Sequence, residues 1–350
     1  MSRFTSYLLL QLSFHLFFTG IATAASITGA GSSAAAPLYN KWAEAFQKKK
    51  GATLEYQAAG SSAGIKQIKE KSVDFGASDV ALNPADLKKY NLIQFPSAIS
   101  GVVPVINVSG IKSGELHLTG EILAGIFAHK ITIWNDAAIS ALNPGVRLPN
   151  KAIEVIVRSD GSGTTYNFTD YLSKISRDWQ VNYGKNFNIA WHKDLTKVKG
   201  SSGIVASLKK TNYSISYVDF NYVIQDKLDY VQLKNHDGNF LSPTAETFAA
   251  ALTNSSWKTV GNFEETLTDK PGNNAWPITM GTFIIMQKNA VNSDRSTVAL
   301  KFFTWAFMAG DHLVNSVDLV RLPDQIQARA FKEMTTVTDL NGKPLEWIAQ

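Results

Sequence analysis

The segment that decides the fold runs Glu154-Val155-Ile156-Val157-Arg158-Ser159-Asp160-Gly161-Ser162-Gly163-Thr164. Its first five residues indicate a buried strand, because three consecutive β-branched side chains stand at its centre. A Gly/Ser loop follows and leads into a helix that we expect to continue through Leu172. A strand, a small-residue loop and a helix, in that order, form the repeating unit of α/β folds. The sequence therefore predicts an α/β protein.

The same unit occurs twice more, nearer the N-terminus. A strand at 26–28 leads through Gly31-Ser32-Ser33-Ala34 into a helix over about 37–49. A strand at 53–58 leads through Gly60-Ser61-Ser62 into a second helix. Further strands are expected at 75–79, 214–218 and 283–286, and a further helix at 297–309.

Composition narrows the classes of protein that this chain can be. The 350 residues are 45% hydrophobic and 18% charged, which excludes an intrinsically disordered chain. The absence of cysteine excludes disulfides, thiolate catalysis and cysteine metal sites. A net charge of +5, with both signs mixed along the chain, is modest for a nucleic-acid binder. We therefore expect no nucleic-acid partner.

Residues 1–24 have the three parts of a secretory signal peptide. Arg3 provides the positive start, an apolar run covers 7–18, and Ala22-Thr23-Ala24 matches the small-residue cleavage pattern. A membrane anchor is the weaker alternative, because the apolar run is short and no basic flank follows it. We expect an exported mature chain that begins near residue 25.

The three Gly/Ser loops share a physical property that suits an anion. The first turn of a helix leaves backbone N–H groups unpaired and carries a partial positive charge. Glycine lets that backbone approach an oxyanion closely, and serine or threonine adds a hydroxyl donor. Helix capping explains a single such loop equally well. Three in one chain favour a site for one tetrahedral oxyanion where the helix starts converge.

Two charged residues stand at the ends of predicted strands. Arg158 either binds an oxyanion in a bidentate manner while Asp160 holds its guanidinium, or forms only a structural ion pair with Asp160. Asp79 ends the strand at 75–79, at the edge where ligands of open α/β sheets bind. It either caps the next helix or accepts a hydrogen bond from an oxyanion that carries a proton.

Three other patterns are compatible with different functions. Gly29-Ala30-Gly31-Ser32-Ser33-Ala34 matches a short dinucleotide-binding pattern that is common in Gly/Ala loops. Gly60-Ser61-Ser62-Ala63-Gly64 matches the nucleophile loop of hydrolases, with Ser62 as nucleophile, but the sequence identifies no general base. The mature chain's histidines lack metal-ligand spacing, so we expect surface side chains and no metal or cofactor: His117, His129, His192, His236 and His312.

Several segments are ordered and spaced as in one known family: Leu38-Tyr39-Asn40-Lys41-Trp42-Ala43, Gly60-Ser61-Ser62, Val73-Asp74-Phe75-Gly76-Ala77-Ser78-Asp79, Arg158-Ser159-Asp160-Gly161-Ser162-Gly163-Thr164, Ala275-Trp276-Pro277-Ile278-Thr279 and Lys301-Phe302-Phe303-Thr304-Trp305-Ala306. Through them the mature chain resembles, over nearly its whole length, the periplasmic phosphate-binding protein of the bacterial phosphate ABC importer. The resemblance implies a non-enzymatic, monomeric receptor in the periplasm. It would bind inorganic phosphate and deliver it to the membrane permease.

The resemblance also implies a fold and a set of ligand contacts. The fold is the two-lobed, type II periplasmic-binding-protein fold, in which each lobe is a mixed sheet flanked by helices and the ligand lies in the cleft. We expect lobe I at 25–99 plus 276–350 and lobe II at 100–275, with candidate crossovers at 95–103 and 275–283. The implied phosphate contacts are Ser33, the N–H of Ala34, Ser61, Asp79, Arg158, Ser162, Gly163 and Thr164, with Asp160 orienting the arginine.

One departure from the family lies in the first loop. The family pattern Gly-Ala-Gly-x-Thr-Phe-Pro is replaced by Gly29-Ala30-Gly31-Ser32-Ser33-Ala34-Ala35, which loses the large aromatic side chain and the proline. We expect phosphate binding to be kept, with a looser or wetter pocket wall beside Ala34. The alternatives are a secreted phosphoester hydrolase that uses a serine, and an exported surface or signalling protein that has kept the fold.

Overall fold

The computed structural model describes residues 26–258 and 263–347. The predicted signal peptide, residues 1–24, lies outside the described residues. Within the two described ranges, no helix combines the length and the apolar character that crossing a membrane requires. Helices pack around a nine-stranded mixed sheet, so the predicted α/β architecture is confirmed.

The N-terminal part alternates strands and helices, as its Gly/Ser loops predict. Its first strand pairs in parallel with the next two, so the carboxyl ends of all three strands meet at one edge of the sheet. The elements are β1 (Ser26–Gly31), α1 (Ala36–Lys50), β2 (Thr53–Gln57), α2 (Ser61–Lys69), β3 (Phe75–Ser78) and α3 (Pro84–Tyr90). The ligand-binding edge predicted for Asp79 is therefore formed by these strand ends.

One long strand connects the two halves of the molecule. The first part of β4 (Leu92–Asn107) pairs antiparallel with β12 (Thr279–Gln287). From Val102 onward β4 pairs antiparallel with β8 (Ser214–Asp219) instead. The change of partner falls within the predicted crossover at 95–103.

The central part of the chain forms the other half. β6 (Glu154–Arg158) pairs in parallel with β8, and β7 (Thr196–Val198) extends the sheet beyond β6. Three short strands form a separate small sheet. The other elements of the central part are β5 (His117–Leu118), α4 (Gly120–Phe127), α5 (Ala137–Leu142), α6 (Gly163–Ile175), α7 (Arg177–Asn182), α8 (Gly200–Lys210), α9 (Phe220–Asp226), β9 (Asp229–Tyr230), β10 (Gln232–Lys234), β11 (Phe240–Leu241) and α10 (Ala245–Thr253). The 3-10 helix Ser256–Lys258 follows and contacts the C-terminal part of the chain, where Arg329 donates to the carbonyl of Trp257 at 2.7 Å.

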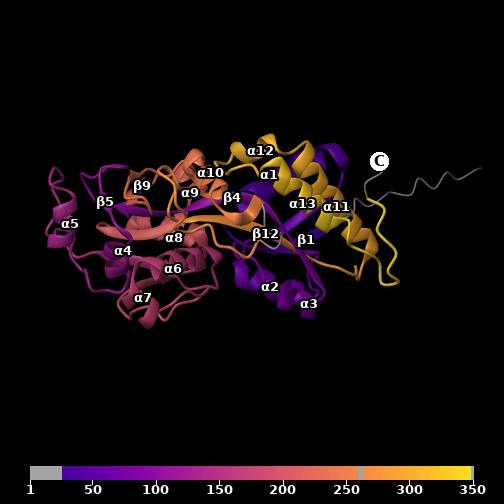
Figure 1. Cartoon of the computed structure of the whole chain (residues 1–350), viewed down its shortest axis with the longest axis horizontal. Coiled ribbons are helices and arrows are strands. Elements are labelled where there is room, and N and C mark those ends of the chain that lie inside the picture. The colour runs from indigo at the N-terminus through magenta and orange to yellow at the C-terminus, as the bar shows by residue number, and fades with distance from the viewer. Residues whose placement is uncertain (1–25, 259–262, 348–350) are drawn as a thin grey trace, which may run out of the picture.

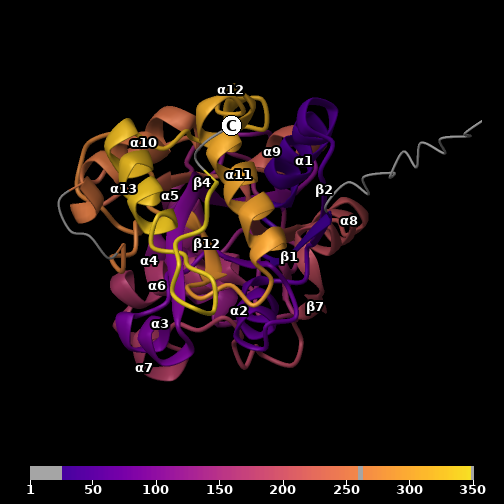
Figure 2. The same cartoon turned by 90° about the vertical axis from the view of Figure 1, so that its right-hand side faces the viewer.

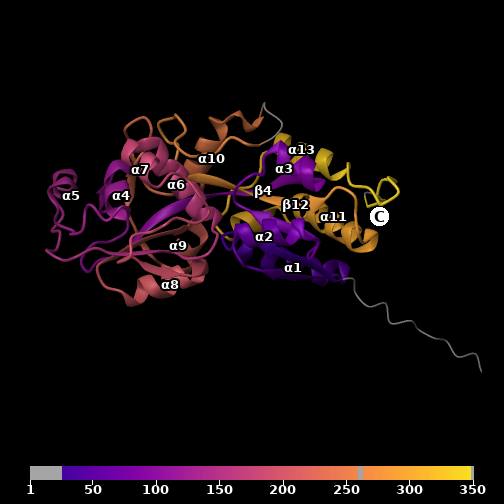
Figure 3. The same ribbon diagram turned by 90° about the horizontal axis from the view of Figure 1, so that it is seen from below.

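After β12 the chain returns to the first half and forms α11 (Ser293–Met308), α12 (His312–Asn315) and α13 (Asp324–Met334). The indigo helices α1 to α3 and the yellow helices α11 and α13 therefore occupy one end of the molecule, and α4 to α8 occupy the other (Figures 1 and 3). Figure 2 shows α2 and α3 on the opposite side of the strands from α1 and α12. The long sheet runs in the order β2-β1-β3-β12-β4-β8-β6-β7, with β9 beside β4.

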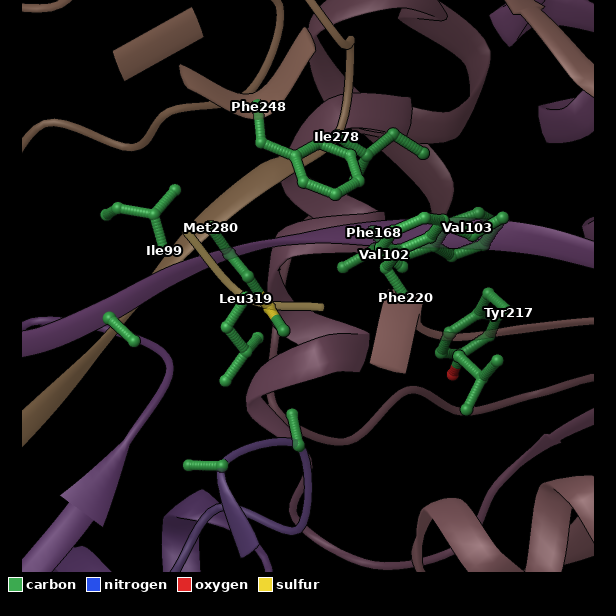
Figure 4. Close-up of a cluster of buried hydrophobic side chains, with 14 of the residues drawn as sticks. Ile99, Val102, Val103, Phe168, Tyr217, Phe220, Phe248, Ile278, Met280 and Leu319 are labelled. Atoms are coloured by element: carbon green, nitrogen blue, oxygen red, sulfur yellow. The ribbon is translucent and has the colours of Figure 1, made fainter. Parts of the chain in front are cut away.

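The hydrophobic core continues through the region where β4 changes partner. Side chains from both halves meet there, including Val102 and Val103 of β4 (Figure 4). The rings of Phe168 and Tyr217 stack with their centroids 4.3 Å apart, and all four side chains are buried. The aromatic residues of α11 that were expected in a core are buried as well: Phe302, Phe303, Trp305 and Phe307.

A buried carboxyl group lies where β4 changes its partner from β12 to β8. Asp219 ends β8, pairs with Val102, and has no exposed surface. This burial raises the pKa of Asp219 from its ordinary 3.8 to about 8. Between about pH 4 and pH 8 the folded chain therefore keeps a proton that the unfolded chain has lost. The stability that Asp219 contributes is full below this interval and is lost as the pH rises through it.

We expect Asp219→Asn to raise the free energy of unfolding at about pH 9 by about 1–3 kcal/mol, because the variant no longer buries a charge whose hydrogen bonding is incomplete. The fall in stability between about pH 4 and pH 8 should also become shallower. Chemical denaturation from about pH 4 to about pH 9 measures both effects. Asp226→Asn is the control, since Asp226 lies partly exposed beside Lys209. An unchanged pH profile in the Asp219 variant contradicts the prediction.

Candidate functional site

Four helix starts meet between the two halves. The backbone N–H of Ser62 at the start of α2 donates to the carbonyl of Gly161, 3.0 Å away in the loop before α6. The hydroxyl of Ser33 before α1 hydrogen-bonds to the hydroxyl of Ser201 at the start of α8, at 2.9 Å. Because each helix start carries partial positive charge, their meeting point favours an anion.

The first loop folds closely against β3. Gly31 has a φ of +143°, and a side chain there would come within 1.9 Å of the carbonyl oxygen of Ala77, so only glycine fits. The N–H of Ser32 donates to the same carbonyl at 3.0 Å. The hydroxyl of Ser32 accepts from the N–H groups of Ala34 and Ala35, at 3.1 and 3.3 Å. These contacts hold the start of α1 beside the end of β3.

Asp79 follows β3 directly and is 3% exposed. The hydroxyls of Ser32 and Ser61 donate to its Oδ2 at 2.8 and 3.3 Å, and the hydroxyl of Thr282 donates to Oδ1 at 2.7 Å. Burial raises the pKa of Asp79, and the hydroxyls and the positive charge of Arg158 oppose only part of that rise. An ionised carboxylate has about four acceptor positions. One position on Oδ1 therefore remains for a further donor.

Arg158 ends β6 and is 2% exposed. Its Nε and Nη2 donate to the two carboxylate oxygens of Asp160 at 2.7 and 2.5 Å, the contact that both interpretations of Arg158 require. The N–H of Gly200 adds a hydrogen bond to Asp160 at 2.9 Å. Burial by itself raises the pKa of Asp160, but the hydrogen bonds and charge of Arg158 hold it below its usual value. The remaining nitrogen, Nη1, donates to the hydroxyl of Ser201 at 3.4 Å, so it faces the helix starts.

The start of α6 lies against Asp79 from the other half. A side chain on Gly163 would come within 2.4 Å of the Ser61 hydroxyl oxygen and 2.8 Å of Asp79 Oδ2, so this close approach requires glycine. Ser162 caps α6 by accepting from the N–H of Thr165 at 3.1 Å, which leaves its hydroxyl hydrogen available as a donor. Thr164 is also buried. Residues of both halves therefore enclose one polar site.

Comparisons with known proteins agree with this geometry. Residues 19–309 match a family model described as a PBP superfamily domain. The phosphate-binding protein PstS of Pasteurella multocida is 42% identical over 323 residues, which cover 92% of this chain and 94% of that protein. The protein of the same name from Haemophilus influenzae is 43% identical over 307 residues, which cover 87% and 91%. The chain belongs to the PstS family of phosphate-binding proteins.

A solved structure supports the fold of this PstS-family chain. The crystal structure of a phosphate binding protein from Stenotrophomonas maltophilia superposes with a TM-score of 0.70, covering 89% of this chain and 94% of that one. Its sequence is 20% identical, so the likeness concerns the fold. The two-lobed α/β fold expected from the sequence is confirmed.

The structure brings the predicted site residues of this family member together. Asp79, Ser61 and Gly163 lie in direct contact, and Arg158 connects to Ser33 through Ser201. The two residues on which the prediction most depends, Asp79 and Arg158, therefore face one site. Their assignment as ligand contacts stays a prediction.

Three polar contacts of the site lie outside the sequence-based prediction: Ser32, Ser201 and Thr282. A signal exists for Ser201, because Gly200-Ser201-Ser202 repeats the Gly-Ser-Ser pattern of the second loop and follows the short strand β7. No comparable signal marks Thr282, which stands within the apolar strand β12. Ser32 adjoins the predicted Ser33, and the structure assigns the Asp79 contact to the first serine and the Ser201 contact to the second.

The expected looser or wetter wall beside Ala34 needs correction. Ala34 is 1% exposed, so its side chain is sealed from solvent. The amide of Asn221 donates to the carbonyl of Ala34 at 2.8 Å, and the hydroxyl of Tyr222 donates to the carbonyl of Ser33 at 2.9 Å. Helix α9 of the other half therefore covers the first loop, whose side chains are smaller than those of the family pattern. A long-range contact of this kind cannot be inferred from the loop's own residues.

The hydrolase pattern around Ser62 does not form a nucleophile site. Ser62 packs against Gly161, where a side chain would approach the Ser62 hydroxyl oxygen within 2.3 Å. Among the described residues, no histidine or carboxylate hydrogen-bonds to the Ser62 hydroxyl. A serine nucleophile requires an adjacent base to remove its proton. The hydrolase alternative therefore lacks the contact between the Ser62 hydroxyl and a general base that it requires.

Proposed function

We propose that this chain binds one inorganic phosphate ion, in a form that keeps a proton, where the four helix starts meet. The proposal rests on one observation: a buried carboxylate, Asp79, and a buried guanidinium, Arg158, face the same site. Asp79 is a buried carboxylate with one acceptor position left, and Arg158 is a buried guanidinium that faces the same site. A ligand that suits both groups must be negatively charged and must also donate a hydrogen bond. Hydrogenphosphate meets both conditions, whereas sulfate has no proton to donate.

The proposed contacts come from both lobes. Lobe I contributes Asp79, the hydroxyls of its two loops and the backbone at the start of α1. Lobe II contributes the guanidinium, positioned by Asp160, and the N–H and hydroxyl groups at the start of α6. The contacts proposed for the phosphate are Ser33, Ala34, Ser61, Asp79, Arg158, Ser162, Gly163 and Thr164. Arg158 and Ser162 are already positioned by their hydrogen bonds to Asp160 and Thr165, which lowers the cost of ordering them around the ligand, whereas the N–H of Ala34 and the hydroxyl of Ser61 would exchange their present acceptors for phosphate.

The biological setting follows from the relatives, which are named phosphate-binding proteins and not enzymes. We propose that residues 1–24 direct export to the periplasm and that the mature monomer delivers phosphate to the membrane permease of an ABC importer. Lobe I would comprise 25–99 plus 276–350, and lobe II would comprise 100–275. The change of partner along β4 at Val102 supports these boundaries.

Calorimetric titration of the purified mature chain tests the proposal. We expect saturable binding of one phosphate per chain and no detectable binding of sulfate at the same ionic strength. A chromogenic phosphoester should not be hydrolysed. Equal affinity for the two anions, or catalytic turnover of the ester, would contradict the proposal.

The hydrogen bond between Ser33 and Ser201 should stabilise the closed arrangement of the lobes. We expect Ser201→Ala to weaken phosphate binding by about 2–12-fold, because a typical hydrogen bond contributes about 0.5–1.5 kcal/mol. Calorimetry measures the affinity, and Ser202→Ala is the control, since Ser202 is exposed beside it. Similar affinities for both variants would show that the hydroxyl of Ser201 does not stabilise the closed form.

A further inference from the structure

Three potential metal ligands meet on the surface of lobe II. His129 follows α4, and His192 and Asp194 lie in the segment before β7. One carboxylate oxygen, Oδ2 of Asp194, lies 3.5 Å from His192 Nδ1 and 3.8 Å from His129 Nε2. The three ligand atoms all lie within 4.8 Å of one another. Ligand atoms that share a tetrahedral zinc ion at about 2.0–2.1 Å lie roughly 3.4 Å apart.

The backbone holds the two histidines in place. His129 has a φ of +59°, a left-handed conformation that a residue with a side chain adopts at a cost in free energy. His192 follows Trp191, whose indole N–H donates to the carbonyl of Arg158 at 3.2 Å. The conformation of one histidine and the anchored neighbour of the other fix the position of the pair.

The imidazole rings need only a small adjustment to share an ion. Their centroids lie 4.4 Å apart and their planes differ by 15°, so the rings are stacked. The χ2 torsion of histidine is broad, so a rotation of each ring can direct His129 Nε2 and His192 Nδ1 toward an ion bound beside the Asp194 carboxylate. The N–H of Asp194 donates to His192 Nδ1 at 3.4 Å, so an ion bound at Nδ1 would replace this long hydrogen bond.

The surface hollow beside the cluster carries negative charge, although Lys130 and Lys193 adjoin the ligands along the chain. His129 and Asp194 line a surface hollow together with Glu154, whose carboxylate adds negative charge. Among the described residues that line it, none is lysine or arginine. The side chains of His129 and His192 are 30% and 38% exposed, so an ion can reach them from solvent.

We propose that His129, His192 and Asp194 bind a divalent transition-metal ion of the Zn²⁺ class, with water completing the coordination. Two imidazoles and one carboxylate are a ligand set that zinc prefers, and three protein ligands leave one position open. The ion would tie the end of α4 to the segment before β7. Sequence spacing did not indicate this site, because its histidines come from separate elements that only the fold brings together.

Titration of the metal-free mature chain with Zn²⁺ in phosphate-free buffer at neutral pH tests the proposal. We expect one saturable site and a rise in the unfolding temperature when Zn²⁺ is added. His192→Ala and Asp194→Asn should each weaken Zn²⁺ binding at least about tenfold, since losing even an indirect partner of a metal ligand costs about 10–100-fold. Co²⁺ should give the visible absorption of a low-coordinate cobalt site, and these variants should lose it.

His129→Gly separates a metal site from a structural contact. Glycine adopts the left-handed conformation without strain, so the metal-free variant should unfold at the same or a higher temperature. It should nevertheless lose the rise that Zn²⁺ produces. His236→Ala is the matched control, because His236 lies 3.5 Å from a carboxylate oxygen of Asp269 and belongs to no cluster of three potential ligands among the described residues. Zn²⁺ affinity that is equal in His129→Gly, His236→Ala and the unmodified chain would overturn the proposal.

Discussion

Replacing Arg158 by alanine should weaken phosphate binding about a thousandfold. The guanidinium is 2% exposed and supplies a full positive charge to a site where solvent screening is small. Truncating one partner of a buried, hydrogen-bonded charge pair costs about 3–5 kcal/mol, and each 1.4 kcal/mol changes an affinity tenfold. Calorimetric titration with phosphate measures the loss. Arg295→Ala is the matched control, since Arg295 pairs with Asp74 at 2.7 Å among contacts separate from the site.

The variant also leaves Asp160 buried without its counter-ion, and this could reduce folding stability by itself. The double variant Arg158→Ala/Asp160→Asn removes the orphaned charge and separates the two effects. We expect the double variant to recover much of the lost unfolding temperature and still to bind phosphate about a thousandfold more weakly. A folded double variant with affinity near that of the unmodified chain shows that Arg158 only supports the structure.

The parts of the fold that were predictable are those encoded by neighbouring residues. The strand at 154–158 and the helix after it follow from a β-branched run and a Gly/Ser loop, and the structure shows both. The proline-containing segment at 95–103 was expected to cross between lobes, and β4 changes its partner there. Local patterns suffice in these cases because hydrophobic period and turn chemistry act over a few residues.

The sequence predicted site residues only where they lie in Gly/Ser loops or at the ends of strands. Asp79, Ser61 and Gly163 lie on predicted loops and strand ends, and the structure brings them into contact. Thr282 reaches Asp79 from the middle of an apolar strand, so only strand pairing places it there. The covering of Ala34 by Asn221 likewise depends on contact between the two halves. Such contacts are properties of the tertiary fold, and hydrophobic period does not encode them.

Asp79→Asn should reduce the preference for phosphate over sulfate by about 10⁴-fold. A site with a buried group that requires a ligand proton rejects the analogue lacking it by about 10⁴–10⁵-fold. The amide keeps the shape of the carboxylate and one acceptor oxygen, and it can turn an N–H group toward the ligand. Sulfate then meets a donor instead of a second acceptor. Titration with both anions at matched ionic strength gives the ratio of their affinities.

The ratio separates selection of the ligand from support of the structure. If Asp79 only fixed the first two loops through Ser32 and Ser61, Asp79→Asn would weaken both anions equally and leave the ratio unchanged. If the carboxylate accepts the ligand proton, sulfate affinity must rise while phosphate affinity falls or stays the same. Asp74→Asn controls for the loss of a hydrogen-bonded carboxylate elsewhere, because Asp74 accepts from Thr28 and Arg295. If the ratio of phosphate to sulfate affinity changes in Asp79→Asn and not in Asp74→Asn, the Asp79 carboxylate selects the ligand by accepting a hydrogen bond from its proton.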